Sequence, residues 1–133
     1  MDRLIVDTSA WIEAFRPQGE GKLKETVKQL ILEAQVLLPG LIMAEILRGT
    51  KTREEYRMLS ELLSSLSYLP VEDSFWNGLA KFSFDLLRKG VTVPLTDTYI
   101  ALLAIDNDVP LLHRDSHFDL IAKESGLRVF RTR

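Results

Sequence analysis

Short apolar runs alternate along the chain with longer stretches in which apolar residues recur every three or four positions. The short runs are typical of strands buried in a parallel sheet, and we expect them at residues 4–6, 36–38, 68–71, 110–113 and 127–130. Pro70 has no N–H to donate in a central strand, so the segment 68–71 is predicted at an edge of the sheet.

The longer stretches predict amphipathic helices, because their apolar residues fall on one face at the helical period. We expect these helices at residues 8–16, 22–34, 41–48, 53–65, from 73 or 74 to 89, from 96 onward and at 115–125. Asp73 or Ser74 is expected to cap the fifth of them. Pro39 and Gly40 are expected to break the chain between the second strand and the helix after it.

Strands separated by helices predict right-handed βαβ units. The fold class is therefore α/β, with three α/β/α layers, a mostly parallel central sheet and helices on both faces. The 133 residues match the length of one domain, and no linker, internal repeat or low-complexity tract interrupts them. We expect residues 1–133 to form a single domain.

Composition narrows the chemistry that this fold can carry. The chain has no cysteine and two histidines, which excludes disulfides, thiol nucleophiles and metal sites rich in cysteine or histidine. Any metal would be held mainly by oxygen. The uncharged stretches fall well below the ~18 residues of a membrane span, and the amino-terminal apolar run is too short for a signal-peptide core. We expect a cytoplasmic protein with no membrane partner.

Four acidic residues stand at similar points relative to the predicted strands. Asp7 follows the first strand, Glu45 lies in the helix after the second, Asp97 begins a helix, and Asp115 follows the strand at 110–113. Because the carboxyl ends of parallel strands share one edge of a sheet, these side chains are expected to converge. Carboxylates ~4 Å apart repel by about 4 kcal/mol at an effective dielectric near 20. Such a cluster favours a bound cation, and Mg²⁺ and Mn²⁺ prefer oxygen ligands.

Each acid also has a simpler explanation. Aspartate is a favoured helix cap, so Asp7, Asp97 and Asp115 each fit capping when considered alone. Glu45 fits an exposed ion pair with Arg48, three residues along the same helix. Apolar neighbours on that helix favour a partly buried carboxylate, which needs a partner.

Four segments contain these acids: IVDTSAWIE, LPGLIMAEILRG, PLTDTYIALLA and LLHRDSHFDLIA. In this order, and over essentially the whole chain, they resemble the four conserved blocks of the PIN-domain ribonucleases, especially the VapC-type toxins of toxin–antitoxin pairs. The resemblance implies a PIN-like fold and a metal-dependent endoribonuclease with Mg²⁺ or Mn²⁺ as cofactor. Such an enzyme would hydrolyse RNA phosphodiester bonds as the toxin of a type II toxin–antitoxin system. It places the catalytic, metal-binding acids on Asp7, Glu45, Asp97 and Asp115.

Residues beside these acids are auxiliary candidates. The family's small hydroxyl residue next to the first acid falls on Thr8 or Ser9. Many relatives carry a further acid two positions after the fourth one, where this chain has His117, and Asp119 lies on the next turn. His117 is a candidate for a ligand through water or a phosphate contact, although a lone histidine on a helix is more often a surface or packing residue. A threonine common just before the fourth acid is His113 here.

RNA binding requires cationic contacts, although 17 basic and 19 acidic residues give a net charge of −2. Arg48, Lys51 and Arg53 lie close together after the second acid, and Arg114 adjoins the fourth. These four residues predict a positive rim around an acidic centre. A solvated helix face explains the first three equally well.

The resemblance also implies a homodimer and a small VapB-like antitoxin that wraps the toxin and obstructs its active site. The apolar helices around residues 41–66 are a candidate surface for this antitoxin, although core packing explains many of the same residues. A non-catalytic RNA-binding or scaffold protein on a PIN-like fold is the alternative. It predicts RNA binding without metal-dependent cleavage.

Overall fold

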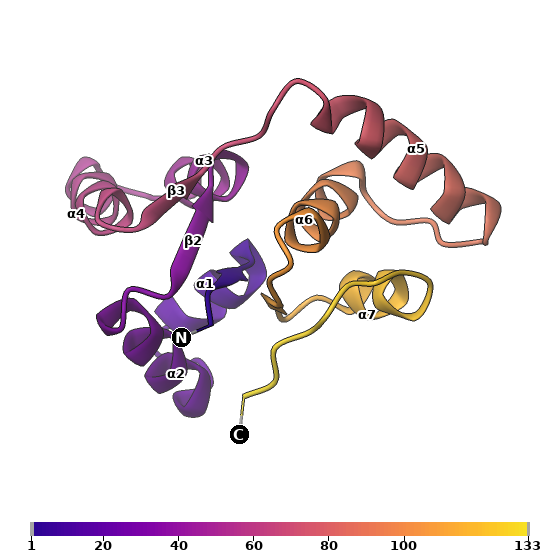
Figure 1. The fold of residues 1–133 in the computed structure, drawn as a ribbon. Helices are drawn as coiled ribbons and strands as arrows, with labels where there is room; N and C mark the ends of the chain where they lie inside the picture. Colours follow the sequence, from indigo (N-terminus) through magenta and orange to yellow (C-terminus); the bar gives the residue numbers. More distant parts are fainter. Residues whose placement is uncertain (1, 133) are drawn as a thin grey trace.

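The computed structural model describes residues 2–132. Their centre is a sheet of four strands that pair in parallel, in the order β3-β2-β1-β4 (Figure 1). The strands are β1 (Leu4–Val6), β2 (Val36–Pro39), β3 (Ser67–Leu69) and β4 (Leu111–Leu112). Every residue of β1, β2 and β4 is buried, as expected where helices cover both faces of a parallel sheet. The predicted α/β class with three layers is confirmed.

The register of the sheet brings the ends of its strands to one edge. Leu4 pairs with Val36, and Ile5 pairs with Leu111, so β1 lies between β2 and β4. The chain leaves all three strands in the same direction because they are parallel. β3 lies at an edge of the sheet, as predicted, but it spans Ser67–Leu69 and ends before Pro70, whereas the strand was expected at residues 68–71.

Seven helices in the described residues form two groups beside the sheet (Figure 1). In the first group, α1 packs against α2 and α3, and α3 packs against α4; in the second, α6 packs against α5 and α7. The helices are α1 (Thr8–Phe15), α2 (Gly21–Leu32), α3 (Gly40–Arg48), α4 (Arg53–Ser64), α5 (Phe75–Arg88), α6 (Leu95–Asp106) and α7 (Ser116–Lys123). Within residues 2–132, none is both long and apolar enough to cross a membrane.

Fully buried apolar side chains anchor the four helices that carry or adjoin the candidate acids. Trp11 of α1, Ile42 of α3, Ile100 of α6 and Phe118 of α7 are at most 1% exposed. All four belong to one hydrophobic core around the strands. The acids are therefore attached to helices that the core holds in place, which favours a fixed arrangement of their side chains.

Three local predictions are wrong. Residues 127–130 form no strand, because β4 has two residues and offers only Leu111 for a single bridge to Val129. Pro39 and Gly40 do not form a loop between the second strand and the next helix, because Pro39 is the last residue of β2 and Gly40 is the first of α3. Ser74 occupies the N-cap position of α5 but already has helical backbone angles, and its side chain caps nothing.

Candidate active site

Two aspartates follow neighbouring strands and cap the helices that come after them. Asp7 follows β1, and its carboxylate accepts hydrogen bonds from the Ser9 amide at 2.9 Å and the Ser9 hydroxyl at 2.6 Å. Asp115 follows β4 and accepts a hydrogen bond from the His117 amide at 2.9 Å. Because β1 pairs with β4, both carboxylates lie at the same edge of the sheet. Capping is confirmed for both residues and leaves further carboxylate lone pairs for a ligand.

The Ser9 hydroxyl connects these two loops. It donates to Asp7 and accepts a hydrogen bond from the backbone N–H of Arg114 at 3.0 Å. One side chain of α1 therefore holds the loop after β4 close to the first carboxylate.

Asp97 and His117 complete a compact group with Asp115. Asp97 lies in the first turn of α6, whose N-cap position is Pro94, so the capping explanation fails for this acid. His117 Nδ1 lies 2.8 Å from Asp97 Oδ2 and 3.2 Å from Asp115 Oδ1. One potential ligand atom from each of these three residues lies within 4.8 Å of the other two. The structure therefore brings the third and fourth predicted acids together, with a histidine between them.

Glu45 is held by Thr8 rather than by a basic residue. The Thr8 hydroxyl donates a hydrogen bond to Glu45 Oε1 at 2.7 Å. Among the described residues Glu45 forms no ion pair with Arg48, so that alternative is wrong. Thr8 adjoins Asp7 at the start of α1, and this hydrogen bond links the second candidate acid to the first.

Burial and mutual repulsion disfavour ionised carboxylates in this group. Burial raises the pKa of Asp7, the hydrogen bonds from Ser9 partly oppose that rise, and the charge of Asp115 adds to it. Burial also raises the pKa of Asp97; His117 opposes the rise, and Asp115 and Asp7 add to it. Three carboxylates thus share one electrostatic environment, and a bound cation would favour their ionised forms.

The donor atoms of this group fit a divalent metal ion. They are carboxylate oxygens together with one imidazole nitrogen, all neutral or anionic when deprotonated. Asp97, Asp115 and His117 are half-buried, which leaves room for water molecules to complete the coordination. Asp7 is 6% exposed, and its negative charge contributes to the raised pKa of Asp97.

His113 supports Asp115 from within the core, a contact that the sequence analysis missed. Its Nδ1 accepts a hydrogen bond from the Asp115 amide at 3.1 Å, and burial lowers the pKa of His113. Its buried Nε2 has no hydrogen-bond partner among the described residues, with Asp119 Oδ1 at 3.4 Å. Asp119 therefore lies next to His113 and outside the group of Asp97, Asp115 and His117.

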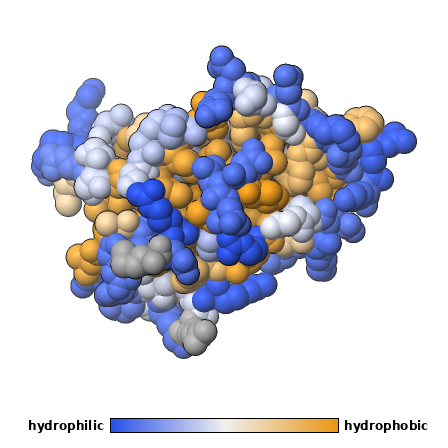
Figure 2. Space-filling view, viewed as in Figure 1, coloured by the Kyte–Doolittle hydropathy of each residue, from blue (hydrophilic) through white to orange (hydrophobic). Residues whose placement is uncertain are grey.

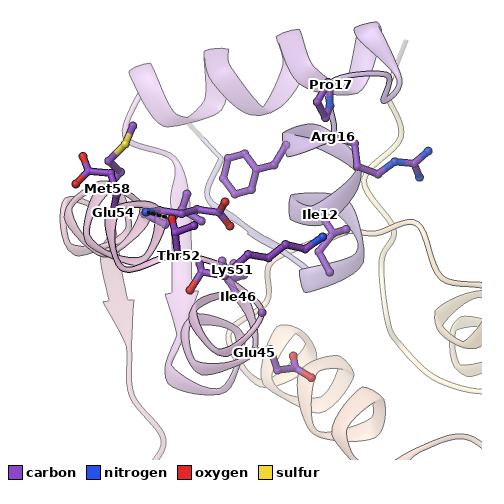
Figure 3. A pocket seen from close by; sticks show the side chains of 14 residues that line it. Ile12, Arg16, Pro17, Glu45, Ile46, Lys51, Thr52, Glu54 and Met58 are labelled. Atoms are coloured by element: carbon purple, nitrogen blue, oxygen red, sulfur yellow. Dashed lines mark hydrogen bonds between the residues drawn. The ribbon is translucent and has the colours of Figure 1, made fainter.

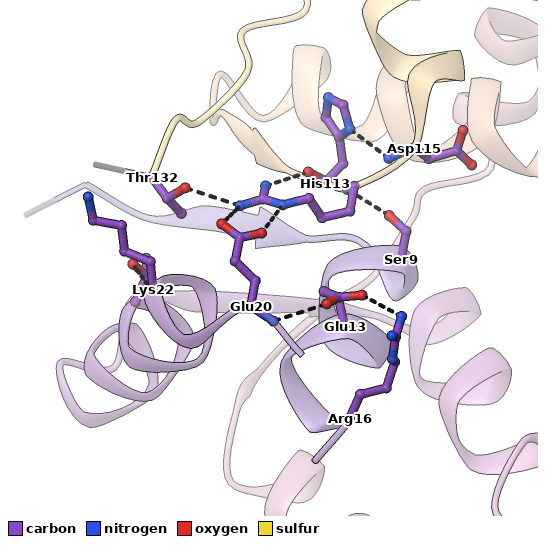
Figure 4. A network of polar contacts seen from close by, with 10 residues as sticks. Ser9, Glu13, Arg16, Glu20, Lys22, His113, Asp115 and Thr132 are labelled. Carbon is purple, nitrogen blue, oxygen red and sulfur yellow. Dashed lines mark hydrogen bonds and ion pairs between the residues drawn. The ribbon is translucent and has the colours of Figure 1, made fainter. Parts of the chain in front are cut away.

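Arg114 is engaged by other parts of the chain. Its guanidinium donates two hydrogen bonds to the Glu20 carboxylate, at 3.0 and 3.1 Å, and one to the Thr132 hydroxyl at 3.1 Å (Figure 4). The other three basic candidates, Arg48, Lys51 and Arg53, are exposed. Sequence analysis did not find Glu20, because it lies far from Arg114 along the chain.

A groove of about 850 Å³ begins beside Glu45 and runs between α1, α3 and α4 (Figure 3). Its apolar lining includes Ile12, Ile46 and Met58, and Lys51 also lines it. Ile12 and Met58 are 54% and 58% exposed, so this apolar surface is open to a partner.

The comparisons with known proteins agree with this fold. Residues 4–124 match the PIN domain family. A VapC ribonuclease of Mycobacterium bovis is 34% identical over 129 residues, which cover 94% of this chain and 96% of the relative. Ribonuclease VapC1 of Methanocaldococcus jannaschii is 24% identical over 129 residues, covering 96% of this chain and 87% of the relative.

Solved structures share the fold at lower identity. VapBC2 from Rickettsia felis, bound to a DNA fragment from its promoter, matches with a TM-score of 0.79, 18% identity and 98% of each chain covered. FitAcB from Neisseria gonorrhoeae matches with a TM-score of 0.77, 22% identity and 96% of each chain covered. The chain belongs to the PIN domain family. Within that family, its curated relatives carry the name VapC ribonuclease.

Proposed function

We propose that this protein is a metal-dependent endoribonuclease of the VapC type and the toxin of a type II toxin–antitoxin pair. The grouping of Asp97 and Asp115, with Asp7 in the same electrostatic environment, carries the proposal. The identity of 34% with a VapC ribonuclease supports it. A non-catalytic RNA-binding or scaffold protein gives no reason to hold carboxylates together against their repulsion.

The proposed cofactor is Mg²⁺ or Mn²⁺. Asp7 and Asp97 are proposed as its principal ligands, and Glu45 and Asp115 as residues that bind it through water or orient the attacking water. A divalent ion supplies a more acidic water nucleophile and positive charge opposite the phosphate oxygens.

The chain's own contribution to catalysis is orientation. Ser9 fixes the carboxylate of Asp7, and Thr8 fixes that of Glu45, through hydrogen bonds of 2.6 and 2.7 Å. Carboxylates held in place before RNA arrives avoid reorganisation during the reaction. Because water attacks rather than the 2′-hydroxyl of the RNA, the proposed products carry 5′-phosphate and 3′-hydroxyl ends.

Exposed basic residues are proposed to bind the RNA backbone. Arg48 ends α3, Lys51 lies in the turn that follows, and Arg53 begins α4, and all three residues are exposed. Arg114 would first have to leave Glu20 to bind RNA, so we propose a smaller contribution from this residue.

The groove between α1, α3 and α4 is proposed as the docking site of a VapB-like antitoxin. Its apolar lining suits the apolar face of an antitoxin segment, and Glu45, Glu54 and Glu55 in the same groove suit basic residues on that segment. A segment seated here reaches Glu45 and would obstruct the site. Met58→Glu should weaken antitoxin binding in calorimetry while leaving RNA cleavage intact, and equal affinity would contradict this placement.

A homodimer is proposed from the family resemblance, and α5 offers apolar surface for it. Trp76, Phe84 and Leu87 of α5 are 54%, 57% and 58% exposed. Apolar residues also lie among hydrophilic ones on the face in Figure 2. Light scattering should give twice the monomer mass, and Phe84→Glu should lower it; a wild-type monomer rejects the dimer.

Purified protein incubated with total RNA tests the nuclease directly. Cleavage is expected with Mg²⁺ or Mn²⁺, and not with EDTA or in Asp7→Asn. Mapping of fragment ends should find 5′-phosphates, whereas 2′,3′-cyclic phosphates would reject the proposed chemistry. RNA binding without cleavage in any metal would favour the non-catalytic alternative.

Expression in cells tests the toxin assignment. The wild-type protein alone should arrest growth, and Asp7→Asn should relieve the arrest. Circular dichroism of the purified variant supplies the folding control. A folded variant that is equally toxic would show that Asp7 does not carry the activity.

A further inference from the structure

His117 occupies the position between two candidate metal ligands. Its Nδ1 lies 2.8 Å from Asp97 Oδ2 and 3.2 Å from Asp115 Oδ1. At this position many PIN-domain relatives carry an acid. This chain therefore places a nitrogen donor where the resemblance implies an oxygen donor, within 3.2 Å of both carboxylates.

Two of the three spacings among these donor atoms match the edge length of an octahedral metal site. With metal–ligand distances of about 2.1 Å, adjacent ligands in an octahedron lie about 3.0 Å apart. The two distances from His117 Nδ1, 2.8 and 3.2 Å, lie on either side of that value. Hydrogen bonding explains this geometry less fully, because one N–H on Nδ1 points well at only one acceptor.

The start of α7 fixes His117 relative to Asp115. The His117 amide donates to Asp115 Oδ1 at 2.9 Å, so the backbone of this residue and the carboxylate are joined directly. The imidazole is 40% exposed. When Nδ1 donates its lone pair to a metal, the ring proton resides on Nε2, where water can accept it.

We propose that His117 Nδ1 binds the divalent ion directly, together with Asp97 and, in place of contact through water, Asp115, and that this nitrogen gives the site a preference for Mn²⁺ over Mg²⁺. The inference rests on the proposed nuclease function and names the metal preference of the same site. Imidazole is a softer donor than carboxylate, and Mg²⁺ binds oxygen ligands almost exclusively. A neutral imidazole also carries one negative charge fewer than a carboxylate. The lost charge weakens the binding of a strongly hydrated ion such as Mg²⁺ most.

The test measures metal coordination separately from RNA cleavage. Full-length protein stripped with EDTA is loaded with Mn²⁺ and studied by pulsed electron paramagnetic resonance. The wild type should show hyperfine coupling to a directly bound nitrogen, and His117→Asp should lose it. His113→Thr removes the other imidazole of the chain and should keep the coupling. In competition calorimetry, His117→Asp should lower the ratio of Mn²⁺ to Mg²⁺ affinity about tenfold or more.

Two results would overturn the inference: no nitrogen coupling in the wild type, or an unchanged affinity ratio in a folded His117→Asp variant. The wild-type spectrum decides the coordination even where the variant fails to fold. Nitrogen coupling without RNA cleavage supports this inference and counts against the proposed function. Cleavage without nitrogen coupling does the reverse.

Discussion

Asp97→Asn removes one negative charge from the acidic group while preserving the size of the side chain. An oxygen of Asp97 lies within 4.8 Å of one of Asp115, and two unit charges at this separation repel by about 3.5 kcal/mol at an effective dielectric near 20. Solvent reduces this repulsion, because the two side chains are 17% and 33% exposed. Asparagine keeps a hydrogen bond to His117 but loses its charge, at a cost of about 1 kcal/mol. Without metal, the variant should be more stable than the wild type by about 1 kcal/mol.

Metal should reverse this order. At a metal concentration a hundred times the dissociation constant, the wild type gains about 2.7 kcal/mol in its free energy of unfolding. The variant lacks one ligand and should gain far less. The wild type should therefore have the lower melting temperature in EDTA and the higher one in MnCl₂.

Thermal unfolding of both proteins in EDTA and in MnCl₂ measures this effect. Asp85→Asn is the matched control, because Asp85 is a half-exposed acid of α5 that pairs with Lys81 at 2.8 Å. Its stability should change by about 0.5 kcal/mol or less in both solutions. If Asp97→Asn is markedly less stable than the wild type in EDTA, Asp97 is a structural residue and the argument fails. Equal stabilisation of both proteins by Mn²⁺ would place the ion elsewhere.

Three further predictions concern the residues that support the site. Thr8→Val removes the 2.7 Å hydrogen bond to Glu45. It should lower the rate of RNA cleavage about 10- to 100-fold and leave the circular dichroism spectrum unchanged. A rate within about twofold of the wild type would show that Thr8 does not position Glu45. Burial lowers the pKa of His113, so below about pH 6.5 the unfolded chain binds a proton that the folded protein resists. The wild-type free energy of unfolding from urea titrations should therefore fall between pH 7.5 and 5.5, and the fall should be smaller in His113→Thr; equal slopes would contradict the burial argument. Phe118→Ala empties a fully buried position and should cost about 3–5 kcal/mol in the same titrations, whereas a loss below about 1 kcal/mol would show that the core around α7 is loosely packed.

The strands and helices could be predicted where the apolar pattern is long or fully buried. Leu4–Val6 and Val36–Leu38 are continuous apolar runs, and both are strands at those positions. The expected strand at 127–130 fails because its apolar residues pack beside a strand of two residues, and pairing depends on the partner's length as well as on local sequence. Ser74 does not cap α5 with its side chain, because its backbone angles are already helical.

The grouping of the acids could be predicted from the ends of the strands. The side-chain contacts between different helices and loops could not be predicted. Asp7 and Asp115 follow paired strands, so topology alone brings them to one edge. The placement of His117 against Asp97 depends on how α6 packs on α7, which no periodicity reports. The pairing of Glu20 with Arg114 joins residues 94 positions apart. Such contacts become visible only when the chain is folded.

The Ser9 hydroxyl donates its proton to Asp7 after β1 and accepts a hydrogen bond from the N–H of Arg114 after β4. It therefore makes the motions of these two turns depend on each other. A fluctuation that lifts the turn after β4 must stretch the contact with Asp7, and the converse also holds. Relaxation experiments should therefore detect correlated motion, with the same exchange rate at both turns. Ser9 has no substitute among residues that lack a group able to donate and accept at once.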